Sequence, residues 1–223
     1  MTSSQNNIIE KAKHLLQSQY ADESTGHDWL HLERVLKNAI TIHQTEGGDY
    51  FLIVMGALLH DVTDYKLNDS ESEGADKLLK IFTQLELNEE LQKQILKIIE
   101  EVSFSGGYGK TPSTIEAKIV QDADRLDALG AIGIARAFAY GGKKNRLLYH
   151  TDILPQHYKN KLAYQKSNAP TINHFYEKLL KLMDLFNTQT AKQIAQERHE
   201  FMLQFLDNFF EETGLDKSKY KII

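Results

Sequence analysis

Histidine and aspartate residues of the kind that bind metal ions occur in three separate segments of this sequence. In the first segment, HDWLHLERV, His27 and His31 stand four positions apart. On a helix, that spacing brings both side chains to one face. Two histidines on one face either bind a ligand or line a packing interface between helices, and this pair alone does not separate the two interpretations.

The second segment places a histidine and an aspartate directly after an apolar run. His60 and Asp61 follow FLIVMGALL, which spans residues 51–59. A run this apolar is expected to form a buried helix. A charged side chain in a buried position is costly unless it is paired or coordinates a cation. Neighbouring helical positions differ in direction by about 100°, yet both side chains can reach one ion held at the helix end. A divalent ion would offset the cost of burial.

The third segment, QDADRLDALG, brings three carboxylates close together after an apolar stretch. Asp122, Asp124 and Asp127 lie within six residues and need cations nearby. The alternative interpretation is helix capping together with a salt bridge to Arg125. Because the sequence contains no cysteine, any metal site must use nitrogen and oxygen ligands.

The rest of the sequence predicts the helices that must position these segments. Apolar residues recur at spacings of three and four, and only three prolines interrupt the chain. Helices are expected at residues 5–20, 28–46, 50–62, 71–84, 88–104, 113–138, 170–184 and 188–212. Glycine-containing sequences are expected to end the second, fifth and sixth of them, at Gly47-Gly48, Ser105-Gly106-Gly107 and Gly141-Gly142. The sequence therefore predicts an all-α protein.

No shift in composition divides the chain, so residues 1–223 are expected to form one domain. Its motif-bearing core is expected to span about residues 20–150. Residues 140–169 lack a clear period and are expected to form a long loop or short helices beside the site. Two amphipathic helices within residues 170–212 either complete the fold or form a homodimer interface.

The composition of the chain argues against two classes of binding partner, nucleic acids and membranes. Lys+Arg number 26 against 31 Asp+Glu, a net charge of -5 without a basic arm, which argues against duplex nucleic acid. The apolar run at 51–59 is about half of the roughly 20 residues needed to cross a bilayer, so no membrane partner is expected. The start of the chain lacks the order of a signal peptide, and the absence of cysteine suits a reducing compartment. We expect a cytoplasmic protein.

Together the three segments resemble the HD-domain superfamily of metal-dependent phosphohydrolases. Its pattern is a histidine, a later His-Asp doublet and a distant aspartate, which here are His31, His60-Asp61 and Asp124. The surrounding H-x-x-R-V, L-L-H-D-V and I-V-Q-D-A-D-R-L-D-A-L-G-A-I-G fit as well. The chain looks closest to small single-domain bacterial members, among which nucleotide pyrophosphohydrolases are found. The resemblance implies a helical fold with a metal site between core helices.

The resemblance also implies a divalent ion bound by His31, His60, Asp61 and Asp124. Two imidazoles and two carboxylates suit Mn²⁺, the ion we expect, and also Fe²⁺, Ni²⁺, Zn²⁺ or Mg²⁺. Superfamily members with two metals carry further histidines between the doublet and the last aspartate. Residues 62–123 contain none, so a single ion is expected.

Asp64, three residues after Asp61, is the candidate general base because it lies near the site without serving as a ligand. Its side chain is shorter than the glutamate that some relatives carry at this offset. The alternative is a solvated aspartate in a turn. His27 is expected to contact the substrate or to hydrogen-bond a ligand residue.

Cationic side chains that could bind phosphate lie near the motifs. Lys66 follows Asp64 closely, and Arg125 follows Asp124 directly. A basic run further along contributes Lys143, Lys144 and Arg146, which could hold a triphosphate. The alternative for this run is a solvated turn favoured at a helix C-terminus.

The function expected from this site is hydrolysis of a nucleoside or deoxynucleoside triphosphate to monophosphate and pyrophosphate by metal-activated water. A nucleotidase acting on monophosphates would use the same four ligands. A regulatory module would bind metal or nucleotide without turnover. A helical adaptor would keep the histidines and aspartates as a polar network without metal.

Overall fold

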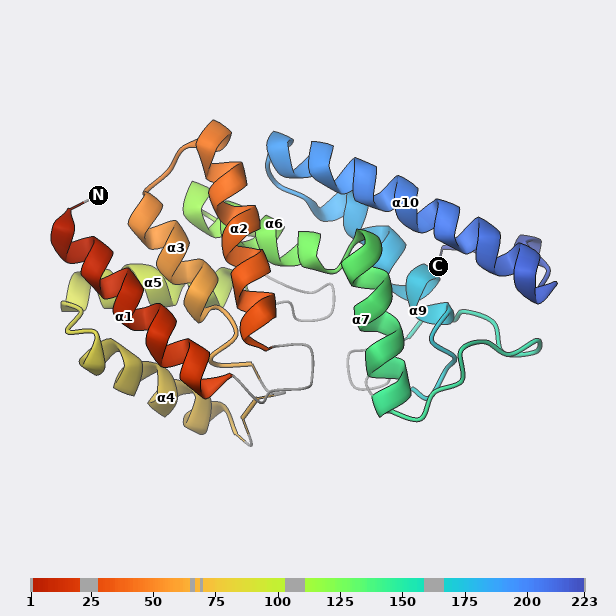
Figure 1. Cartoon of the computed structure of the whole chain (residues 1–223), viewed down its shortest axis with the longest axis horizontal. Coiled ribbons are helices and arrows are strands. Elements are labelled where there is room, and N and C mark those ends of the chain that lie inside the picture. The colour runs from red at the N-terminus through yellow and green to blue at the C-terminus, as the bar shows by residue number, and fades with distance from the viewer. Residues whose placement is uncertain are drawn as a thin grey trace. The chain divides into compact units, whose positions relative to one another are not determined.

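The computed structural model describes residues 2–20, 28–64, 67–68, 70–102, 111–158 and 167–222 (Figure 1). These ranges contain helices and no strand, which confirms the predicted all-α fold. None of the helices within them is long and apolar enough to cross a bilayer. The chain forms two compact units, Met1–Asp124 and Arg125–Ile223. Whether they act as one domain, as the sequence predicts, stays a prediction.

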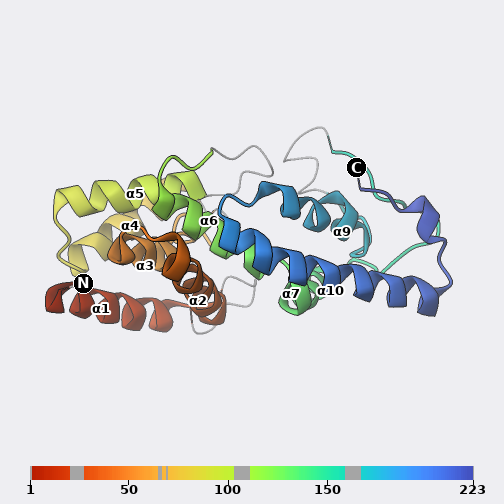
Figure 2. The same ribbon diagram turned by 90° about the horizontal axis from the view of Figure 1, so that it is seen from above.

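The first unit is built around its most apolar helix. Its helices are α1 (Ser3–Gln19), α2 (Trp29–Glu46), α3 (Tyr50–Leu59), α4 (Glu71–Gln84), α5 (Glu89–Val102) and most of α6 (Ile115–Asp127). Helix α3 packs against α1, α2 and α5, and Figure 2 shows it between α1 and α5. Every residue from 53 to 59 is buried, which confirms the buried helix predicted from the apolar run.

The N-termini of α2 and α3 are set by aspartates. The carboxylate of Asp28 accepts a hydrogen bond from the His31 N–H, and that of Asp49 accepts one from the Leu52 N–H. Such caps satisfy backbone donors that the helix itself leaves unpaired. Helix α2 ends at Glu46 with Gly47 as its C-cap, as predicted.

The prediction of one continuous helix over residues 113–138 was wrong. Helix α6 ends at Asp127, and α7 (Gly130–Lys143) begins after a two-residue break. Gly130 has φ +69°, a left-handed conformation that other residues rarely adopt. Helix α7 also continues through Gly141 and Gly142 instead of ending before them.

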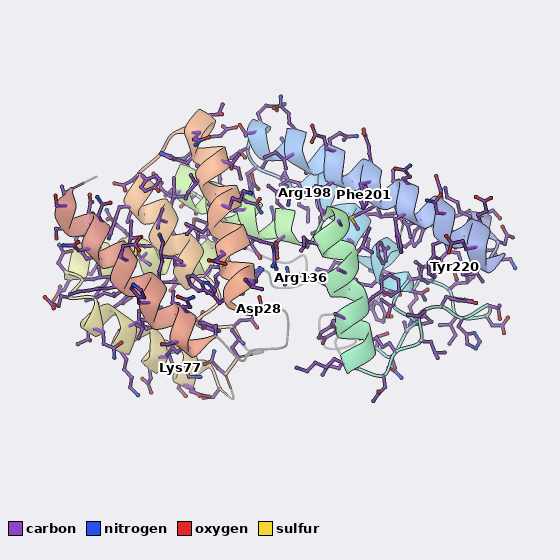
Figure 3. The ribbon with its side chains drawn as sticks, in the orientation of Figure 1. Asp28, Lys77, Arg136, Arg198, Phe201 and Tyr220 are labelled. Carbon is purple, nitrogen blue, oxygen red and sulfur yellow. The ribbon has the colours of Figure 1, made fainter. Side chains whose placement is uncertain are left out.

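Two arginines of the second unit hold the C-terminal end of α6 at this break (Figure 3). Arg198 of α10 donates to the Leu126 carbonyl at 2.5 Å. Arg136 of α7 donates to the carboxylate of Asp127 at 2.6 Å and to its carbonyl at 3.4 Å. Cations at this position complement the partial negative charge of a helix end, so α6 is capped by one side chain of the next helix and one that is 72 positions away.

The second unit consists of α7, α9 (Asn173–Glu177), the 3₁₀ helix η1 (Leu179–Leu185), α10 (Gln189–Thr213) and the 3₁₀ turn η2 (Lys217–Lys219). Helix α10 matches the helix predicted at 188–212, and it packs against α7 and η1. The core of this unit contains four aromatic rings whose centroids lie 5.7–6.3 Å from those of their neighbours: Phe138, Phe175, Phe205 and Phe209. Residues 144–158 contain no helix.

The single helix predicted at 170–184 was also wrong. Lys178, with φ -142°, interrupts it after α9, and 3₁₀ geometry follows. In a 3₁₀ helix, side chains three positions apart lie on the same side. Leu179 and Leu182 have this spacing and both are buried, so the 3₁₀ turns serve to pack these leucines.

Candidate metal centre

His31 lies in the first turn of α2 and is fully buried. Its backbone N–H donates to the Asp28 carboxylate at 2.7 Å, so the cap of the helix acts directly on this residue (Figure 3). The sequence contained a signal for this cap, because an aspartate directly before a periodic apolar pattern is typical of a helix start.

His60 and Asp61 lie in the turn that directly follows α3. Nδ1 of His60 donates to the Ala57 carbonyl at 2.9 Å, one turn back along the same helix. A carbonyl can only accept, so this contact fixes the proton on Nδ1 and directs Nε2 to the site. Metal-binding histidines commonly have such a partner on their second nitrogen.

Asp124 projects from α6, which is held beside α2 by a buried asparagine. Nδ2 of Asn38 donates to the Ala123 carbonyl at 3.1 Å. This bond fixes the backbone one residue before Asp124 relative to the helix that carries His31. Sequence reasoning missed Asn38, because nothing in the local pattern marks a partner 85 positions away.

The structure brings the four predicted metal ligands together. Nε2 of His31 lies 3.2 Å from a carboxylate oxygen of Asp61 and 3.6 Å from one of Asp124. Nε2 of His60 lies 3.4 Å and 3.7 Å from oxygens of the same two residues. One ligand atom from each of His31, His60 and Asp124 falls within a group no more than 4.8 Å across.

The charges of this cluster shift the titration of its members. Burial by itself lowers the pKa of His60, but the negative charges of Asp61 and Asp124 outweigh it and raise the pKa to about 10. Burial opposes ionisation of Asp124, yet its contact with His60 and the charge of His31 lower the pKa to about 2. The metal-free cluster therefore contains a charged Asp124 carboxylate beside a protonated His60 imidazole.

These residues fit a divalent ion. Nε2 of His60 is buried and has no hydrogen-bond partner among the residues that the structure describes. Metal–ligand distances of about 2.0–2.2 Å allow one ion to contact donor atoms that lie up to about 4 Å apart or slightly more. Imidazole nitrogen and carboxylate oxygen suit Mn²⁺, Fe²⁺ and Zn²⁺. His31, His60 and Asp124 are positioned for a metal, and Asp61 contacts both histidines.

Asp64 ends the turn that begins at His60. Its backbone N–H donates to the Asp61 carbonyl at 2.9 Å, and the residue is partly exposed. It therefore lies one short turn from a predicted ligand and can reach solvent. Its role as a base stays a prediction, and so do the roles of His27 and Lys66, which lie outside the described residues.

Arg125 follows Asp124 in α6 but belongs to the second unit. Its guanidinium group donates to the carbonyl of Leu185 in η1. This bond commits at least one of its N–H groups to the fold of the second unit. A phosphate contact for Arg125 stays a prediction.

The basic run spans the end of α7 and the turn that follows it, and most of its residues are exposed. Arg146 donates to the Ser167 carbonyl at 2.7 Å, and its guanidinium group lies 5.7 Å from the centre of the Tyr140 ring. The ammonium group of Lys144 lies 5.8 Å from the same ring. Lys143 is exposed in the last turn of α7. These contacts give Lys144 and Arg146 a structural role, and their contact with substrate stays a prediction.

Comparison with known families agrees with this geometry. Residues 29–129 match the model of the HD domain family, a range that contains all four predicted ligands. YpgQ of Bacillus subtilis is 40% identical over 199 residues, which cover 88% of this chain and 89% of YpgQ. A crystal structure of YpgQ in complex with ADP covers 92% of this chain and 97% of that one, with a TM-score of 0.73.

Two further solved structures are similar along almost their whole length. One is an HD-superfamily hydrolase from Bacillus thuringiensis, 45% identical, which covers 95% of this chain and 100% of its own with a TM-score of 0.74. The other, from Lactobacillus plantarum, is 35% identical and covers 96% and 99%, with a TM-score of 0.83.

Proposed function

Because the chain belongs to the HD superfamily of metal-dependent phosphohydrolases, we propose that it hydrolyses nucleoside or deoxynucleoside triphosphates to monophosphate and pyrophosphate. The observation that carries this proposal is the buried pair of imidazole Nε2 atoms facing the carboxylates of Asp61 and Asp124. The complex of YpgQ with ADP supports a nucleotide as the substrate. ADP shares with a triphosphate the anhydride between the α and β phosphates.

In this proposal the two histidines and the two aspartates offer the ion different donor atoms. His31 and His60 would hold Mn²⁺ through Nε2, and Asp61 and Asp124 would hold it through carboxylate oxygens. When bound, the ion lowers the pKa of a coordinated water from about 15.7 towards roughly 7 to 9 and polarises a phosphoryl oxygen. The Ala57 carbonyl keeps the proton of His60 on Nδ1, so Nε2 is always the nitrogen that faces the ion.

Asp64 acts as the general base. Its carboxylate oxygen accepts a proton from the attacking water as the water oxygen bonds to the α phosphorus. The bond from that phosphorus to the bridging oxygen breaks, and pyrophosphate leaves. Partial exposure of Asp64 lets it pass the proton to solvent after each turnover.

The test combines metal analysis with product analysis. Purified protein is loaded with Mn²⁺, its metal content is measured by mass spectrometry, and a panel of nucleotides is assayed separately for phosphate and pyrophosphate. We expect one ion per chain, and pyrophosphate with monophosphate from triphosphates. Asp61→Ala is expected to abolish both binding and turnover. Asp49→Ala is the matched control, since it removes an aspartate that caps the opposite end of α3.

Three other results would contradict the proposal. Phosphate released from monophosphates would identify a nucleotidase. Bound metal with no product would indicate a regulatory module. Failure to bind any divalent ion would leave the cluster as a polar network.

A further inference from the structure

The backbone that carries the candidate base is a series of turns after α3. The Val62 N–H donates to the Leu59 carbonyl at 3.1 Å, and the Asp64 N–H donates to the Asp61 carbonyl at 2.9 Å. The Asp64 carbonyl accepts from the Leu67 N–H at 3.0 Å, and neither it nor the Val62 carbonyl lies within a helix. The path of the backbone at Asp64, from which its side chain starts, therefore depends on the groups that hold those two carbonyls.

One side chain holds both. Nδ2 of Asn68 donates to the Val62 carbonyl at 2.9 Å and to the Asp64 carbonyl at 2.8 Å. A primary amide has two N–H groups, so each carbonyl receives its own hydrogen bond. Asn68 thereby ties together the two ends of the segment from residue 62 to residue 64.

Helix α4 supports this arrangement from outside. Gly74 approaches so closely that a Cβ atom there would lie 3.0 Å from Cα of Thr63 and 3.2 Å from Nδ2 of Asn68. Lys77, one turn further along α4, donates to the Leu67 carbonyl at 3.3 Å (Figure 3). Any larger residue at position 74 would displace either the turn or the amide.

Asn68 has no chemistry of its own to contribute. An amide neither accepts a proton at neutral pH nor carries charge, and both of its N–H groups are engaged by backbone. Its effect on the reaction has to pass through the residues whose backbone it holds. Of these, Asp64 is the one with an ionisable side chain.

We propose that Asn68, supported by α4, is a positioning residue for Asp64, and that its two hydrogen bonds set the direction of the candidate base. This inference rests on the proposed function, because it assigns a role relative to that reaction. Groups that act on a reacting centre through others typically change activity by about 10- to 100-fold when removed. Small displacements of a catalytic group have comparable effects.

The test compares Asn68→Ala, Asp64→Ala and the double variant, all loaded with Mn²⁺. Asn68→Ala is expected to lower kcat by about 10- to 100-fold, with KM and Mn²⁺ affinity within about twofold of wild type. In the Asp64→Ala background, the same substitution is expected to change kcat by less than about twofold, since the group it positions is gone.

A second readout uses the metal-free protein. Amide hydrogen exchange over residues 60–64 is expected to speed up in Asn68→Ala, because the turn loses two hydrogen bonds. Asn88→Ala is the matched control: its side chain accepts from the Leu91 N–H at 2.9 Å and caps α5. That variant is expected to lower Tm while leaving kcat and exchange in the turn unchanged.

Several outcomes would overturn the inference. The first is an unchanged kcat in Asn68→Ala. The second is a further loss of kcat in the Asp64→Ala background as large as in wild type. The third is a loss of Mn²⁺ affinity, which would place the effect on Asp61 instead. If Asn68→Ala does not fold, Asn68→Ser keeps one donor, and its kcat is expected to lie between wild type and Asp64→Ala. Wild-type protein without turnover would overturn the proposed function as well, whereas active wild type with an equally active Asn68→Ala would overturn this inference alone.

Discussion

Binding of Mn²⁺ at pH 7 is expected to release about one proton per ion. In the metal-free protein the charges of Asp61 and Asp124 raise the pKa of His60 to about 10, so its imidazole is protonated at neutral pH. The proton on Nδ1 stays there, donated to the Ala57 carbonyl, and the ion needs the lone pair of Nε2. The proton on Nε2 is therefore the one released.

The sign and size of the pH dependence follow from the direction of this shift. A raised pKa stabilises the metal-free fold below about pH 6.5, and this contribution is lost as the pH rises towards 10. Metal affinity changes in the opposite sense, rising about tenfold per pH unit between about 6 and 9. At pH 7, about three units below the pKa, competition by the proton costs about 4 kcal/mol of binding free energy.

Isothermal titration calorimetry measures this directly. The heat of Mn²⁺ binding is recorded at one pH in several buffers, and its slope against the ionisation enthalpy of the buffer gives the protons released. Asp64→Asn is the control, because it retains the cluster and is expected to give the same slope. A slope of zero together with an affinity independent of pH would refute the assignment of His60 as a ligand through Nε2.

Three further predictions concern single aspartates. Asp61→Ala is expected to weaken Mn²⁺ binding by more than about 100-fold, beyond the 10- to 100-fold typical of groups that only support ligands, as measured by titration. Asp64→Ala is expected to keep its metal while kcat falls about 10²- to 10⁴-fold, and a normal rate would remove Asp64 as the base. Asp127→Ala is expected to lower the free energy of unfolding by about 1–3 kcal/mol in urea titrations, less than a fully buried pair would lose, because its partner Arg136 is 26% exposed.

Periodicity in the sequence predicted the helices whose apolar faces are continuous. Helices α1 to α5 and α10 lie close to their predicted ranges, because each buries a stripe that recurs every three or four residues. The break between α6 and α7 was missed for a physical reason. It depends on Arg198, which reaches the Leu126 carbonyl from 72 positions away, and one glycine in a helical pattern does not reveal such a contact.

The candidate metal ligands could be found from the sequence because polar residues there stand where the apolar run predicts burial. Two charged or polar residues after an apolar run, as at His60-Asp61, indicate a function that compensates the cost of burial. The two asparagines that hydrogen-bond to the backbone of this site do not follow an apolar run in this way, so the sequence did not mark them. Asn38 and Asn68 are ordinary polar residues in the sequence, and only the folded chain shows that each of them donates to a backbone carbonyl next to or at a site residue.

The proton and the metal ion serve the same electrostatic purpose in this cluster. Asp61 and Asp124 place two negative charges beside two buried imidazoles, and a positive charge is needed to balance them. In the metal-free protein the proton on His60 supplies part of that charge. A divalent ion held by the same residues would supply more positive charge and would have coordination positions left for water and phosphate. We therefore expect the proton on His60 and the ion to compete for this cluster, so that loss of the ion is accompanied by uptake of a proton at Nε2 of His60.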